Sequence, residues 1–112
     1  MTNDDKYEIL VRLTHAVFDL EDAIASAKQT LESKPSYPEH AMVRLNHYQN
    51  IVHQQKLAFP VITKLIRDSR YAELSLEVRR VNALSELIRE DAKELLTVLA
   101  NPTAPLDRPE YN

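Results

Sequence analysis

The residues in this sequence that could do chemistry are carboxylates and histidines, because the chain has no cysteine and no glycine. Without cysteine there is no thiol nucleophile, disulfide or thiolate zinc site. Without glycine there is no Gly-rich phosphate loop. Acidic residues gather in two places, and facing helices could bring them together around Mg²⁺ for hydrolysis of a nucleotide. They are Asp19, Glu21 and Asp22 in the first place, and Glu86, Glu90, Asp91 and Glu94 in the second. A metal-dependent helical hydrolase is therefore one hypothesis.

Basic residues interleave with the second acidic group. Arg89 follows Glu86 by three residues and Lys93 follows Glu90 by three, which is typical of a salt-bridged helix face in solvent. Only Asp91 is unusual, because its phase places it near the apolar arc of its helix. We therefore expect no catalytic residue, no bound metal and no cofactor, and an enzyme is the less favoured interpretation.

The chain has four histidines, a residue type that commonly binds metal ions. His40 and His47 are seven residues apart and share one helical stripe, while His15 lies four residues before Asp19 on the polar side of its segment. The Glu-x-x-His spacing of a di-iron bundle does not occur anywhere in the chain. The histidines, including His53, are interpreted as surface or rim residues.

Apolar residues recur at alternating spacings of three and four, which predicts three long helices. The first, over about residues 3 to 33, has the seam Leu10, Leu13, Val17, Leu20, Ile24, Ala27 and Leu31. The second opens at a capping box formed by Ser36 and Glu39, and its seam is Ala41, Leu45, Tyr48, Val52, Gln55, Phe59, Ile62 and Ile66. The third, from the polar turn at 67–70 to about residue 100, has the seam Leu74, Val78, Val81, Ser85, Ile88, Ala92, Leu95 and Leu99.

Prolines interrupt the helical pattern of the sequence. Pro60 removes one hydrogen bond from the second helix. Because the apolar spacing keeps its phase across it, we expect a kink at Pro60 rather than a break. Three further prolines follow residue 100 and predict a flexible tail over 103–112 that is dispensable for folding. The predicted fold is an all-α antiparallel bundle of three long helices, a single domain over residues 1–102.

The chain has more apolar side chains than one three-helix bundle can bury. Phe18 belongs to a second stripe on the first helix, and the second helix is apolar on several sides around Leu57, Val61 and Leu65. In a monomer this surface would exceed the few hundred Å² that soluble proteins usually expose. We therefore predict a symmetric homodimer, and a larger bundle, formed through these four residues.

Gln55 and Ser85 are polar residues inside apolar seams. A buried polar group of this kind usually fixes register or oligomeric state at some cost in stability. We predict that the two residues determine the specificity of assembly. In the alternative, rotation near Pro60 leaves Gln55 half-exposed.

Charge and hydropathy argue against two further classes of function, nucleic-acid binding and membrane insertion. The net charge is −3, and residues 35–68 carry four basic against two acidic residues, far from the basic stripe that nucleic acid requires. Neither a signal peptide nor a membrane-spanning apolar run is evident, so we expect a cytoplasmic protein. The favoured function is a non-enzymatic interaction module with another protein as partner, such as an adaptor, a secretion chaperone or an immunity- or antitoxin-like binder.

Overall fold

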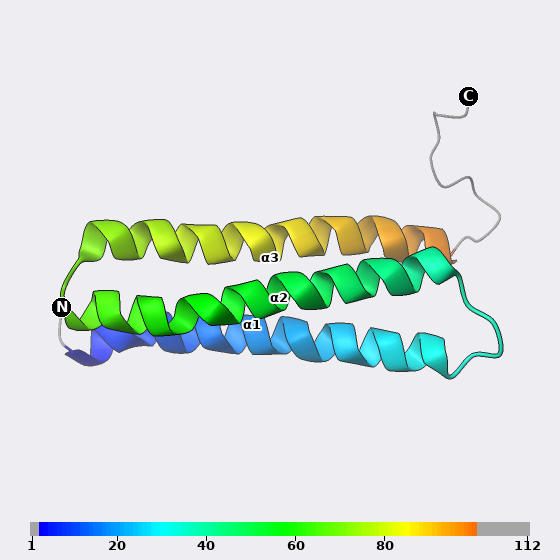
Figure 1. The fold of residues 1–112 in the computed structure, drawn as a ribbon, viewed down its shortest axis with the longest axis horizontal. Helices are drawn as coiled ribbons and strands as arrows, with labels where there is room; N and C mark the ends of the chain where they lie inside the picture. Colours follow the sequence, from blue (N-terminus) through cyan, green and yellow to red (C-terminus); the bar gives the residue numbers. More distant parts are fainter. Residues whose placement is uncertain (1–2, 101–112) are drawn as a thin grey trace, which may run out of the picture.

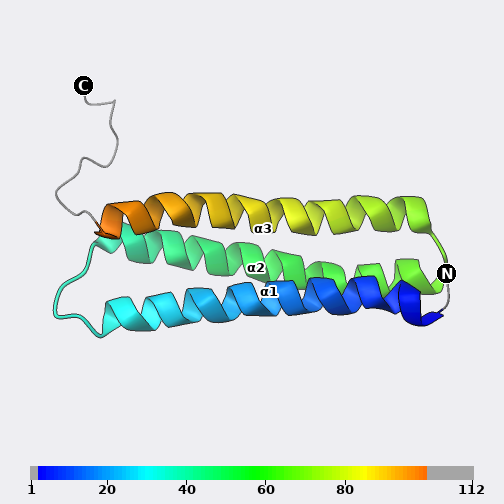
Figure 2. The same cartoon turned by 180° about the vertical axis from the view of Figure 1, so that it is seen from behind.

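The computed structural model describes residues 3–100, which form three helices joined by two short connections (Figure 1). α1 spans Asn3–Glu32, α2 spans Glu39–Arg67 and α3 spans Tyr71–Ala100. Consecutive helices run in opposite directions (Figures 1 and 2). The predicted all-α antiparallel bundle is confirmed. The proline-rich tail and the boundary at residue 102 lie outside the described residues and stay predictions.

The core consists of residues of the predicted seams together with Leu65, which was not predicted to be in a seam. In α1, Leu13, Val17, Ile24 and Leu31 are buried, and the other seam residues pack against them. In α2 and α3 the buried apolar residues are Ala41, Leu45, Tyr48, Val52, Ile62, Leu65, Ile66, Leu74, Val81, Ile88 and Leu95. Burying a large aliphatic side chain contributes roughly 1.5–3 kcal/mol, so apolar packing is the main stabilising contribution in this bundle.

α2 continues through Pro60 without a break, as its apolar phase predicts. Pro60 is exposed, so the hydrogen bond that it cannot donate to Lys56 is missing on the solvent side. The predicted cap at Ser36 is wrong. α2 begins at Glu39 with Pro38 as its N-cap, and no side chain caps it. A proline disfavours helical geometry at the residue before it. Pro38 therefore prevents Tyr37 from joining the helix.

The connection from α2 to α3 is a Schellman turn made without glycine. The Arg70 N–H donates to the Leu65 carbonyl at 2.9 Å, and the Ser69 N–H donates to the Ile66 carbonyl at 3.1 Å. Ser69 takes the left-handed position of this motif, with φ of 56°. Glycine usually occupies this position, because a Cβ is disfavoured there.

α2 is the central helix of the bundle. α1 and α3 each pack along α2 but contact each other much less. The molecule is accordingly flat, with principal extents of 54, 32 and 18 Å. Figures 1 and 2 show α2 running between the other two helices. The space between α1 and α3 is therefore where the bundle can open to solvent.

Candidate functional site

An apolar groove opens between the C-terminal halves of α1 and α3, and the first turns of α2 complete its lining. Its volume is about 1060 Å³. The apolar residues that line it are Leu20, Ala23, Ile24, Ala27, Leu31, Leu45, Ile88, Ala92, Leu95, Leu96, Val98 and Leu99. No inspection of one helix at a time reveals it, because its two walls come from helices that are not consecutive in the chain.

Short side chains explain why the bundle opens at this end. Ala23 and Ala27 on α1 and Ala92 on α3 line the groove. Toward the opposite end, the buried residues of the same two helices are larger, such as Leu13 on α1 and Leu74 on α3. Alanine positions on facing helices leave a volume that the remaining side chains do not fill.

Apart from Tyr48, the ionisable residues that line the groove all have basic side chains. They are Lys34, His40, Arg89 and Lys93, and no acidic residue lines it. Arg89 lies 3.7 Å from Glu86 and Lys93 lies 3.2 Å from Glu90. All four of these side chains are more than half exposed, and such pairs are worth about 0–1 kcal/mol. The groove therefore combines an apolar lining with basic residues along its edge.

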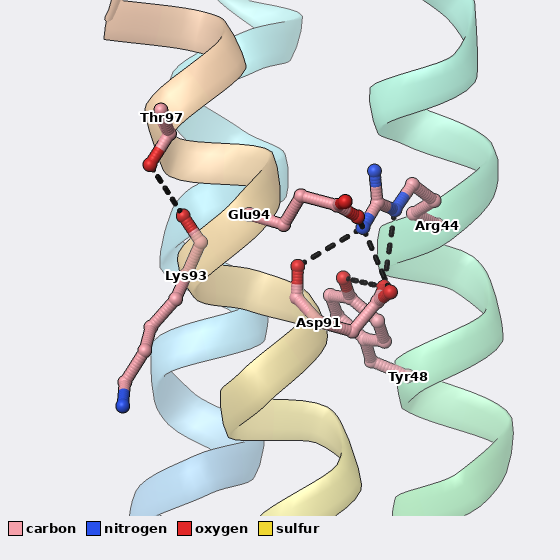
Figure 3. Close-up of polar contacts among 6 residues, drawn as sticks. All are labelled: Arg44, Tyr48, Asp91, Lys93, Glu94 and Thr97. Atoms are coloured by element: carbon pink, nitrogen blue, oxygen red, sulfur yellow. Dashed lines mark hydrogen bonds and ion pairs between the residues drawn. The ribbon is translucent and has the colours of Figure 1, made fainter. Parts of the chain in front are cut away.

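A polar cluster joins α2 to α3 beside the groove (Figure 3). The Arg44 guanidinium contacts the two carboxylate oxygens of Asp91 at 2.8 and 3.0 Å and donates to the Asp91 backbone carbonyl at 3.0 Å. It also contacts Glu94 at 3.0 Å. Tyr48, which lines the groove, donates its hydroxyl hydrogen to Asp91. Lys93 extends away from this cluster in Figure 3.

The electrostatics of the cluster explain why an aspartate lies near an apolar arc. Burial works to raise the pKa of Asp91, but hydrogen bonds from Tyr48 and Arg44 outweigh it, so this pKa lies below its ordinary value. Burial, followed by the hydrogen bond to Asp91, raises the pKa of Tyr48 to about 12. At neutral pH Asp91 is therefore an anion held by a cation and a neutral phenol. Sequence reasoning missed these two partners of Asp91. The available signal was that Arg44 and Tyr48 are four residues apart and so lie on the same face of α2.

Five of the seven carboxylates of the hydrolase hypothesis pair with cations of this chain. Glu21 pairs with Lys56 at 2.8 Å, and the acids of α3 pair with Arg44, Arg89 or Lys93. Within residues 3–100, no three histidine or acidic side chains lie close enough to hold a metal ion. The hydrolase hypothesis gains no support from this part of the chain.

The four residues predicted to form a dimer interface lie in different environments. Phe18 is 41% exposed, packs edge-on against Phe59 with ring centroids 6.3 Å apart, and has the Lys56 ammonium 5.3 Å from its ring centroid. Leu57 and Val61 are exposed on α2. Leu65 is only 7% exposed and belongs to the core, so it offers no surface to a partner.

Gln55 and Ser85 contact each other across the α2–α3 interface. The Gln55 amide nitrogen donates to Ser85 Oγ at 2.7 Å and to the Val81 carbonyl at 2.8 Å. Gln55 is fully buried, so the alternative of a half-exposed side chain is wrong. Its Oε1 atom has no hydrogen-bond partner in the described part of the chain. The specificity role of the pair stays a prediction.

Comparison with known proteins gives no relative: no protein-family model, curated protein or solved structure matches the chain. Among the helices of residues 3–100, none is long and apolar enough to cross a membrane. The candidate site therefore has to be interpreted from its own geometry, and that site is the apolar groove with its basic edge.

Proposed function

We propose that this protein is a non-enzymatic interaction module that binds a helical segment of another protein in the groove between α1 and α3. The observation that carries the proposal is the groove itself, an apolar volume of about 1060 Å³ open to solvent. Soluble proteins rarely leave contiguous apolar surface of this kind uncovered unless it binds something. An adaptor, a secretion chaperone or an immunity- or antitoxin-like binder could each use such a surface.

The dimensions of the groove suit a helix. Its lining extends from Leu20 to Leu31 on α1 and from Ile88 to Leu99 on α3, twelve residues, or eleven helical steps, along each wall. At 1.5 Å per residue these walls are about 16 Å long, or roughly three helical turns. A helix placed there packs its apolar face against both walls, as the fourth member of a four-helix bundle does.

A displayed library of amphipathic helices tests the proposal. Each member has about 12 residues, matching three turns, with apolar residues fixed at helical spacing and the remaining positions varied. Selection is performed on the full chain. Binders should lose at least about tenfold in affinity for Ala23→Trp, which fills the groove from an exposed position.

Ala83→Trp is the matched control, because Ala83 is also exposed on a helix and does not line the groove. Affinity for this variant should equal that for the wild type. A library that gives no binder, or binders that do not distinguish Ala23→Trp from Ala83→Trp, would contradict the proposal.

Addition of Mg²⁺ or Mn²⁺ separates this function from the hydrolase alternative. A hydrolase that binds these ions in the folded state should gain several degrees in Tm, whereas an interaction module should not. Because the acids of α3 are paired with arginine and lysine, we expect no change. A rise in Tm that Glu90→Gln abolishes would favour the hydrolase.

A further inference from the structure

We infer that the occupant of the groove is an amphipathic helix of another protein whose apolar face is flanked by acidic residues. This inference rests on the proposed function and adds the chemistry of the partner. Its basis is the charge of the groove: every charged side chain that lines it is basic, and none is acidic. Complementary charge at the edge of an apolar contact selects among partners of similar hydrophobicity.

The spacing of the basic residues matches a helix. Arg89 and Lys93 are four residues apart on α3, a rise of about 6 Å. Two acidic residues four apart on a partner helix have the same rise, so both can meet these cations at once. Lys34 and His40 lie where α1 ends and α2 begins, and supply a second basic point at that end of the groove.

The present partners of Arg89 and Lys93 do not prevent this exchange. Both side chains pair with glutamates three residues before them on the same helix, and both pairs are exposed to solvent. Exposed pairs of this kind contribute little to stability. A carboxylate on an incoming helix can therefore take their place with little loss.

A second copy of this chain fits the groove less well. In a symmetric dimer formed groove to groove, the basic residues of one copy would face the basic residues of the other, because a twofold interface uses the same surface on both subunits. Like charges placed across an interface oppose association. The predicted homodimer, if it forms, should use the exposed Leu57 and Val61 face instead.

A fatty acid shares the combination of apolar body and negative charge. Its single carboxylate would need basic groups at one mouth of the groove. The basic groups here also lie along the α3 wall, at Arg89 and Lys93. This distribution favours a helix with several acidic residues.

The test uses one helix from the selection, resynthesised with its flanking positions all glutamate, all glutamine or all lysine. Affinities for the full chain are measured by fluorescence anisotropy at low and high salt. The glutamate peptide should bind at least about tenfold tighter than the lysine peptide, and salt should reduce the difference. The double variant Arg89→Glu, Lys93→Glu should reverse this order, whereas Lys64→Glu, an exposed α2 residue outside the groove, should not.

The outcomes separate this inference from the proposed function. If all three peptides bind equally and Ala23→Trp abolishes their binding, the groove binds helices but its charge preference is refuted. If none binds, the proposed function fails as well. Oleate that binds more tightly than the glutamate peptide and is excluded by Ala23→Trp would overturn the inference in favour of a lipid. A dimer that dissociates on Ala23→Trp would overturn it in favour of a second copy.

Discussion

Replacing Gln55 with leucine should stabilise this protein, although it removes two buried hydrogen bonds. Those bonds join the Gln55 amide nitrogen to Ser85 Oγ and to the Val81 carbonyl. Each contributes roughly 0.5–1.5 kcal/mol net. Against them stands Gln55 Oε1, buried without a partner among residues 3–100, and such an acceptor costs roughly 1–3 kcal/mol.

Neither former partner is left unsatisfied by the change. Val81 lies inside α3, where its carbonyl also accepts the helical N–H four residues later, and the Ser85 hydroxyl can turn back to that carbonyl. The leucine adds apolar burial worth roughly 1.5–3 kcal/mol, reduced by any misfit in shape. The expected net gain is about 1 kcal/mol, or about 4 °C in Tm for a domain of this size.

Urea denaturation followed by far-UV circular dichroism measures this gain, with an unchanged m-value as the sign that only stability has changed. Ser85→Ala is the matched control, since Gln55 keeps its bond to Val81 and a small loss of stability is expected. Light scattering should also detect a broader distribution of oligomeric states for Gln55→Leu. A fall in stability of more than about 1 kcal/mol would refute the reasoning, because it would mean that the two hydrogen bonds outweigh the unsatisfied oxygen and the added burial.

Three further predictions concern other parts of the bundle. The pKa of Tyr48 is raised from 10.0 to about 12, so its stabilising contribution is complete below pH 10 and is lost as pH rises toward 12. Tyr48→Phe should weaken this alkaline loss in a titration of Tm. Ser69→Gly should raise the free energy of unfolding by about 1 kcal/mol in urea denaturation, because glycine adopts the positive φ of Ser69 without penalty; no change would mean that the turn is unstrained. Val61 is 46% exposed, so Val61→Glu should leave the helical signal intact and abolish self-association in sedimentation equilibrium. A wild type that is monomeric up to millimolar concentration would contradict this last prediction.

The helices and their buried faces could be predicted because each depends on local spacing. An apolar residue every three or four positions defines one helix face whatever the partner helix is. Hence the spacing predicts that Val17, Ile62 and Ile88 belong to the core, and each is almost completely buried. The same rule explains the burial of Leu65. It follows Ile62 by three residues and so lies on the same buried face of α2.

The groove and the Asp91 cluster could not be predicted in the same way, since each depends on the distance between helices. Ala23 and Ala92 are visible in the sequence, but small residues can also draw helices together and leave no volume open. Whether α1 and α3 close over them is decided by how both pack on α2. Asp91 stood out by its phase, but its partners Arg44 and Tyr48 are more than forty residues away in the chain.

The two walls of the groove are held to α2 by different sets of contacts, and this bears on how an occupant binds. The α3 wall is fixed by Arg44, which makes several charge-assisted contacts to Asp91 and Glu94, together with the hydrogen bond from Tyr48 to Asp91. Along the groove, α1 is joined to α2 by a hydrogen bond from Lys28 to Gln49 at 3.0 Å, by the ion pair of Glu21 with Lys56 at 2.8 Å and by apolar contacts. Both walls are therefore anchored to α2 by polar contacts, and the charge-assisted contacts of α3 lie on the wall that carries Arg89 and Lys93, where the partner's acidic residues would bind.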